Sequence, residues 1–255
     1  MGHVRLGRLP KSKRWQAVVG LMESDAGSAS RIAAATLLAS EAYLRTLGAD
    51  SAVVRAYGLL VGLMTAARQG EFAAEAARLG LRGEAGTSSL AFLASVADVA
   101  RSGAAAEADG SQAGEFAALA LRRALMDTVA TQSVGLFGST VEDLQRAFRA
   151  HSTERQFGEV SRLFFGDFVS RVLQSALDRE APGRLGVAGS SDLLREVDLH
   201  ARESAVIVRD FAGEWLSKKQ FERGDAGITR QDVAGFVAVA LRKLRSEIKR
   251  EGEEG

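Results

Sequence analysis

The scarcity of proline is the feature that most constrains how this chain can fold. Only two prolines, Pro10 and Pro182, occur in 255 residues, and proline is the residue that breaks helix interiors most strongly. No stretch alternates apolar and polar residues for long enough to predict a strand. The sequence therefore predicts an all-α fold, a multi-helix bundle of about nine to ten helices in two packed subdomains.

Apolar residues recur at helical spacing along the whole chain, between polar or glycine-rich breaks. The best-marked helix is the last one, where Thr229 and Asp232 form a capping-box-like pair. Another start is predicted at Ser139, with Glu142 three residues on. The predicted helices cover 13–22, 28–47, 51–68, 71–79, 87–101, 112–131, 139–150, 157–177, 191–216 and 229–248. Breaks are predicted at 80–86, 102–110, 133–138, 182–189 and 223–227.

The composition changes near residue 133. Of the 44 alanines 32 lie before this point, whereas nine of the 12 phenylalanines lie after it. Small side chains let helix axes approach closely, and Gly58 with Gly62 would give one helix a smooth face, while bulky phenylalanine fills a wider core. We predict a basic N-terminal arm over 1–14, an alanine-rich helical subdomain over 15–133 and a phenylalanine-rich bundle over 134–255.

Composition and hydropathy exclude several classes of protein. The absence of cysteine excludes a disulfide framework, thiolate zinc sites, iron–sulfur clusters and a Cys nucleophile. The most apolar stretch, 56–67, is bounded by Arg55 and Arg68, and a spanning helix needs roughly 20 such residues. The apolar run 17–22 ends at Glu23, too early for a signal peptide. We expect a cytoplasmic protein with no membrane contact, and the abundance of arginine and alanine is typical of a GC-rich bacterial genome.

Positive charge is concentrated at the N-terminus. The first 15 residues hold no acidic residue and five basic ones, namely Arg5, Arg8, Lys11, Lys13 and Arg14. Because the chain totals +1, the other 240 residues sum to 1 − 5 = −4. Such an arm, which ends at Trp15, can bind an acidic protein partner, or neutralise phosphates while Trp15 stacks on a base. The alternative is an arm that is solvated or docked on its own protein, with Trp15 as a core anchor.

A second basic cluster lies on the last predicted helix. It consists of Arg242, Lys243, Arg245, Lys249 and Arg250, and it is offset by Glu247, Glu251, Glu253 and Glu254. We interpret this mixture of signs as a solvated helix face.

Two of the three histidines follow an arginine at the same spacing. His151 follows Arg146, and His200 follows Arg195, in each case with four residues between them. This spacing resembles the active-site motif of HEPN-type ribonucleases, which are all-helical domains that dimerise to join two such pairs. The resemblance implies that His acts as general acid or base and that Arg stabilises the phosphorane charge. The alternatives are a bend residue for His151 and a hydrogen-bonded helix-face residue for His200.

No constellation of residues predicts a metal or cofactor site. Glu196, His200 and Glu203 share one helical face, but this set is more typical of a salt-bridging surface than of a metal site. We therefore predict a non-enzymatic helical accessory or adaptor subunit of a bacterial multi-protein system. A protein partner is expected, with nucleic acid bound through the arm as a further expectation. A HEPN-like, metal-independent ribonuclease is the alternative function.

Overall fold

The computed structural model describes residues 12–24, 27–81, 89–106, 111–131, 140–178 and 181–254. All regular structure in these ranges is helical, so the predicted all-α bundle is confirmed. The helices are α1 (Lys13–Met22), α2 (Ala29–Leu47), α3 (Ser51–Gln69), α4 (Phe72–Arg78), α5 (Ser89–Ala106), α6 (Gln112–Leu125), α7 (Val141–Ala150), α8 (Glu154–Leu177), α9 (Ala181–Ser204), α10 (Val206–Arg223) and α11 (Arg230–Glu254), with a π-helical turn η1 (Met126–Ala130) and a 3-10 turn η2 (Gly224–Ala226).

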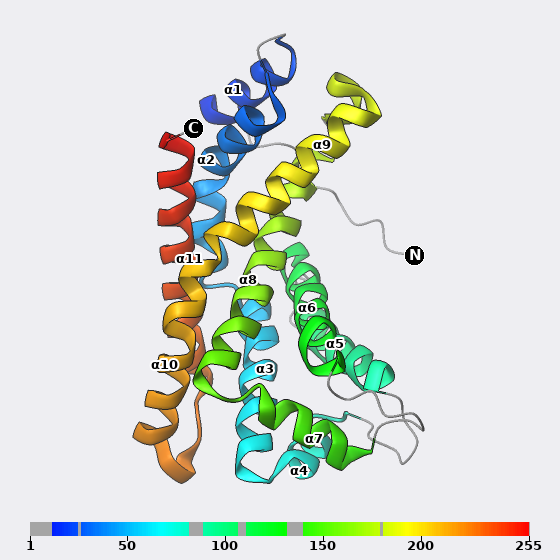
Figure 1. Ribbon diagram of the computed structural model, residues 1–255, viewed down its shortest axis with the longest axis vertical. Helices are drawn as coiled ribbons and strands as arrows, with labels where there is room; N and C mark the ends of the chain where they lie inside the picture. The colour runs from blue at the N-terminus through cyan, green and yellow to red at the C-terminus, as the bar shows by residue number, and fades with distance from the viewer. Residues whose placement is uncertain are drawn as a thin grey trace.

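Helix α8 forms the centre of the bundle, as its apolar residues on several faces predict. Figure 1 shows α6 on one side of α8 and α10 on the other, with α9 running diagonally past the upper part of α8, and these three helices make the main contacts with α8. The aromatic side chains of α8 are fully buried: Phe157, Phe164, Phe165 and Phe168. Burying such side chains contributes about 1.5–3 kcal/mol each, so α8 is a large contributor to the stability of the core.

Two glycines let α8 and α10 approach closely. A Cβ atom at Gly158 would lie 2.5 Å from the backbone oxygen of Arg209, and one at Gly213 would lie 2.0 Å from the backbone oxygen of Glu154. Both distances are shorter than van der Waals contact allows, so any side chain at either position would push the helices apart. The two glycines therefore set the spacing of this helix pair.

The alanine-rich and phenylalanine-rich parts of the chain pack on each other. Tyr57 of α3 enters the aromatic cluster of α8 and stacks on Phe236 of α11, with ring centroids 5.2 Å apart. Its hydroxyl shares a 2.8 Å hydrogen bond with the Ser161 hydroxyl of α8. Buried side chains from both parts form one continuous core. The predicted boundary near residue 133 lies outside the described residues, and so does most of the arm.

Helix starts follow the predicted capping chemistry, with one shift of a single residue. At α11 the Thr229 amide donates to the Asp232 carboxylate at 3.0 Å and the Asp232 amide donates back to the Thr229 hydroxyl at 3.2 Å, which confirms the predicted capping box. At α7 the equivalent pair is Thr140 and Asp143. The Thr140 pair takes the place of the predicted one at Ser139, a residue outside the described ranges.

The predicted single helix over 191–216 is wrong. The chain divides between α9 and α10 at Ala205, which lies against Gly166 of α8. A Cβ atom added at Gly166 would lie 3.4 Å from the Ala205 Cβ. The predicted break over 182–189 is also narrower than expected. α9 begins at Ala181 and kinks only at Gly186, whose φ of 68° favours glycine. Pro182 is tolerated because it lies in the first turn of a helix, where its missing N–H has no helical partner.

A membrane-spanning helix needs a certain length and apolar character. No single described helix is long and apolar enough to cross a membrane, and only α2 and α3, taken together across a 76° bend, have the required length and composition.

Candidate functional site

The basic arm meets the folded body at α1. Arg5, Arg8 and Lys11 lie outside the described residues, and Lys13 is exposed in the first turn of α1. Arg14 donates to the Glu41 carboxylate of α2 at 2.7 Å and to the Leu38 carbonyl at 3.1 Å. The charge of Arg14 is therefore shared with a carboxylate of the same protein.

Trp15 is a core residue. Its side chain is 3% exposed and belongs to the continuous hydrophobic core, next to Val18 and Met22 of the same helix. Because its ring is covered on both faces, this tryptophan is placed as the anchor of α1 rather than as a stacking platform for a base.

The structure places the arginine and the histidine of each pair in different surroundings. In each pair the arginine is exposed and bound to an aspartate one turn earlier: Arg146 to Asp143 at 3.1 Å and Arg195 to Asp192 at 2.7 Å. His151 is 3% exposed at the end of α7, where its Nδ1 lies 2.9 Å from the Ala147 carbonyl oxygen.

His200 is half-buried on α9, and its two ring nitrogens are shielded from solvent. A residue five positions after another on a helix points about 140° away from it, so neither histidine faces its arginine. Among the described residues, no group of three or more His, Asp or Glu side chains is placed to hold a metal ion.

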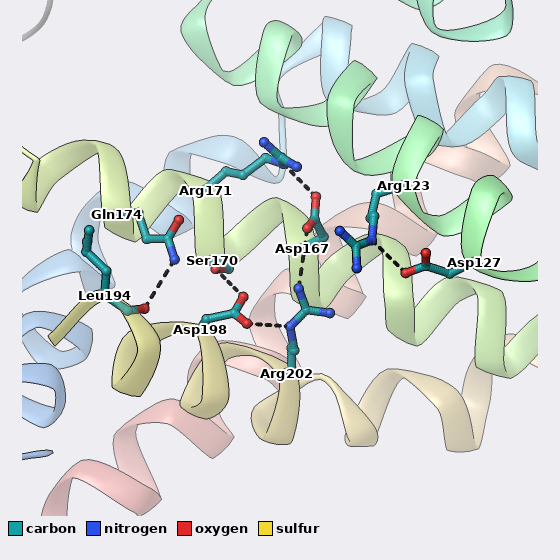
Figure 2. A network of polar contacts seen from close by, with 9 residues as sticks. All are labelled: Arg123, Asp127, Asp167, Ser170, Arg171, Gln174, Leu194, Asp198 and Arg202. Atoms are coloured by element: carbon teal, nitrogen blue, oxygen red, sulfur yellow. Dashed lines mark hydrogen bonds and ion pairs between the residues drawn. The ribbon is translucent and has the colours of Figure 1, made fainter. Parts of the chain in front are cut away.

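A charged network joins α8 and α9, and an ion pair of α6 lies beside it (Figure 2). Asp167 lies at its centre with a side chain only 7% exposed, and it accepts from Arg171 at 2.6 Å and pairs with Arg202 at 3.6 Å. Arg202 also donates to Asp198 at 2.8 Å. The Ser170 hydroxyl donates to Asp198 at 2.7 Å. On the α6 side, Arg123 donates to Asp127 of η1 at 2.7 Å.

The electrostatics of this network indicate a structural role. Burial disfavours the ionised form of Asp198, but the hydrogen bonds from Arg202 and Ser170 outweigh it and hold the pKa of Asp198 below its usual range. The hydrogen bond to Asp127 raises the pKa of Arg123. Three arginines face three aspartates, so the network is neutral and its groups are satisfied within the chain. The contacts of Asp198 with Ser170 and of Arg202 with Asp167 tie α9 to α8, and Arg123 adds a positive charge from α6.

A different surface, between α2 and α11, combines an apolar floor with cations on its rim. We call this hollow of about 320 Å³ the basic groove. It is lined by Leu44, Arg45, Gly48, Ala49, Ala238, Leu241, Arg242 and Arg245. Arg45 and Arg242 are exposed, and neither guanidinium makes an ion pair with a described residue. The groove therefore presents positive charge from both helices.

One carboxylate, that of Glu41, lies among the cations beside the basic groove. The hydrogen bond from Arg14, together with the nearby charges of Arg245 and Lys249, lowers the pKa of Glu41. Arg245 lies 3.9 Å from the Glu41 carboxylate. Glu41 thus lies near three cations, and Arg45 and Arg242 contribute two further positive charges to the same surface. Positive charge is therefore in excess on this surface.

Two other hollows lack this combination. One, of about 610 Å³ between α8 and α10, mixes Arg155 and Arg209 with three acidic side chains, namely Glu154, Glu159 and Asp210. The other, of about 430 Å³, lies between α3, α4 and the start of α11 and contains the smooth Gly58 and Gly62 face. Its rim carries Glu71, Glu75 and Arg78, and Arg78 is bound to Glu75 at 2.7 Å. Neither hollow favours one sign of charge as the basic groove does.

The sequence predicts one solvated face for the α11 cations, but in the structure these cations have different surroundings. Lys243 lies 5.2 Å from the centre of the Phe211 ring, and Arg250 pairs with Glu247 at 3.0 Å. The remaining three, Arg242, Arg245 and Lys249, are spaced i, i+3 and i+7 and face α2. This spacing was readable from the sequence. The contribution of Arg45 was not, because it comes from a helix nearly 200 residues earlier.

Comparison with known proteins adds no relative from which a role could be transferred: no family model matches the chain, and no curated protein or solved structure gives a significant match.

Proposed function

We propose that this chain is a non-enzymatic accessory or adaptor subunit of a bacterial multi-protein system that binds an acidic protein partner. The observation that supports the proposal is the basic groove, where Arg45 and Arg242 have no carboxylate partner among the described residues. Clustered cations repel one another, and an acidic partner would relieve that repulsion. We place this activity in the cytoplasm.

The basic arm is connected to the described body close to the basic groove. Arg14, at the junction of arm and body, pairs with Glu41 next to Arg245 and Lys249. Further positive charge on the preceding residues would therefore join the chain beside the groove. Long-range attraction of this kind speeds association more than it raises affinity, and it weakens as salt is added.

Charge reversal tests the proposal. The variant Arg45→Glu with Arg242→Glu reverses the two rim cations that have no carboxylate partner among the described residues, and the matched control Arg122→Glu with Arg149→Glu reverses two exposed arginines on α6 and α7. Tagged full-length chains would be recovered from the native host at increasing salt, and co-purifying proteins quantified. We expect retention to fall about tenfold or more for the rim variant only. Equal retention by all three proteins, with no dependence on salt, would refute the proposal.

Deleting residues 1–11 removes Arg5, Arg8 and Lys11 but leaves the Arg14–Glu41 pair in place, and the deletion is expected to lower retention at low salt more than at high salt. Binding of a mixed-sequence oligonucleotide is measured in parallel. Tight, salt-dependent nucleic-acid binding that disappears with the arm would assign the arm to nucleic acid instead.

The ribonuclease alternative stays a prediction. RNA incubated with the purified chain should stay intact if the adaptor proposal is correct. Cleavage that is lost in both His151→Ala and His200→Ala would favour the alternative.

A further inference from the structure

Two small residues, Gly48 and Ala238, meet at the floor of the basic groove. A Cβ atom at Gly48 would lie 3.3 Å from the Ala238 Cα, so the end of α2 lies directly against α11. Ala49 and Ala238 are exposed at this surface, and Leu44 and Leu241 are buried below it. The floor is therefore apolar and open to solvent.

The rim supplies charge from two directions. Arg45 stands on α2 and Arg242 on α11, so an occupant of the groove would have a guanidinium on each side. Arg245 lies at the end nearer Glu41 and is already within 3.9 Å of that carboxylate. Arg45 and Arg242 are thus the two rim cations that a ligand anion would reach without displacing a carboxylate.

The composition of the floor indicates which class of macromolecule, nucleic acid or protein, suits the groove better. A single-stranded nucleic acid would use the arginines through its phosphates and would gain from aromatic rings on which its bases stack, and the groove lining contains none. An apolar side chain flanked by carboxylates would use both the floor and the rim. Burying an apolar anchor inside a charged rim is the usual anatomy of a protein interface.

We infer that the basic groove binds a short acidic segment of the partner protein, which places an apolar side chain on the Ala238 floor and carboxylates against Arg45 and Arg242. This inference rests on the proposed function and specifies the chemistry of the partner. The volume of about 320 Å³ is at the lower end of the range for small binding sites, and it suits a single anchoring side chain better than a whole helix face.

A displayed library of random peptides tests this chemistry directly. The full-length chain is immobilised, and bound peptides are selected and sequenced. We expect enriched sequences to combine Leu, Ile, Met or Phe with Asp or Glu on both sides. A synthetic copy of one enriched peptide should lose about tenfold or more in affinity when its carboxylates become amides, and again when its apolar residue becomes Ser. No enrichment, or peptides that lack either feature, would overturn the inference.

A variant of the floor distinguishes this inference from the proposed function. Ala238→Trp fills the groove without changing its charge. The matched control is Ala73→Trp, which adds the same side chain at an exposed site on α4, away from the groove. Circular dichroism melts verify that both variants fold. We expect only Ala238→Trp to lose the selected peptide by about tenfold or more.

The partner-retention assay then distinguishes the possible failures. If the rim reversal abolishes partner retention and Ala238→Trp leaves both peptide and partner bound, the adaptor proposal stands and the groove inference fails. If neither variant changes retention, both fail. Mixed-sequence single-stranded DNA that binds tightly and is displaced by Ala238→Trp would identify nucleic acid as the occupant and would overturn the inference.

Discussion

Tyr57 and Ser161 share a hydrogen bond of 2.8 Å between side chains that are fully excluded from solvent. The two residues stand 104 positions apart, on α3 and α8, so this bond joins the alanine-rich and phenylalanine-rich parts of the chain. Burial raises the pKa of Tyr57 and keeps its hydroxyl protonated. A neutral hydroxyl pair in an aromatic core gives the two parts one preferred register.

Removing one hydroxyl should cost more than removing both. In Tyr57→Phe the Ser161 hydroxyl loses this partner inside the core, so we expect a loss of about 1–3 kcal/mol in the free energy of unfolding. Adding Ser161→Ala removes the orphaned group and should restore part of that loss. Urea denaturation of both single variants and the double variant completes the cycle. Strictly additive losses would show that the two hydroxyls do not interact.

The spacing of α8 and α10 gives a second prediction. In Gly213→Ala the added Cβ would meet the Glu154 backbone oxygen, so the helices must separate, at a cost of about 3 kcal/mol or more. Gly235→Ala on α11 is the matched control, because no atom lies within 4 Å of its added Cβ. That control should gain about 0.5–1 kcal/mol from helix propensity. Similar changes in melting temperature for both variants would contradict the close approach.

The charged network predicts that a buried aspartate matters more than an exposed one. Asp167→Asn removes the charge that Arg171 and Arg202 face, and because these arginines are about one-third exposed, we expect a loss of roughly 1–3 kcal/mol. Asp192→Asn breaks the pair with Arg195 on the surface and should cost under about 0.5 kcal/mol. Chemical denaturation at moderate salt compares the two. Equal losses would mean that the network is no stronger than a surface pair.

The sequence predicted what depends on local chemistry. Helix positions followed from apolar spacing and from the near absence of proline, and the Thr229–Asp232 capping box was visible as a pair of side chains three residues apart. Contacts between helices were out of reach. Nothing near Gly48 in the sequence indicates that Ala238 covers it.

The same limit explains the errors at helix ends. At the division of α9 from α10, Ala205 packs against Gly166 of α8, and this tertiary contact is not visible in the sequence. The ion pair of Arg14 could not be predicted from the sequence either, because its partner Glu41 lies 27 residues further along the chain. In the basic groove, Arg242 and Arg245 could be placed on one helix face, whereas Arg45 could not be placed beside them.

The capping carboxylate of α11 predicts a dependence of stability on pH. Asp232 is surrounded by cations: Arg223 donates to it at 2.7 Å and Lys219 lies 3.7 Å away. The Thr229 amide and hydroxyl donate to its other oxygen at 3.0 and 2.6 Å. The hydrogen bond from Arg223 and those from Thr229 outweigh the opposing effect of burial and hold the pKa of Asp232 well below its usual range.

A depressed pKa means that the folded state favours the ionised carboxylate. The stabilisation by Asp232 is therefore fully present above the unfolded pKa of about 3.9 and is lost as the pH falls toward the folded value. Asp232→Asn should melt at a lower temperature than the wild type at pH 7, and this difference should shrink steadily below about pH 4. Thermal melts of both proteins between neutral and acidic pH measure it. A difference that stays constant over this range would show that the cap does not depend on the charge of Asp232.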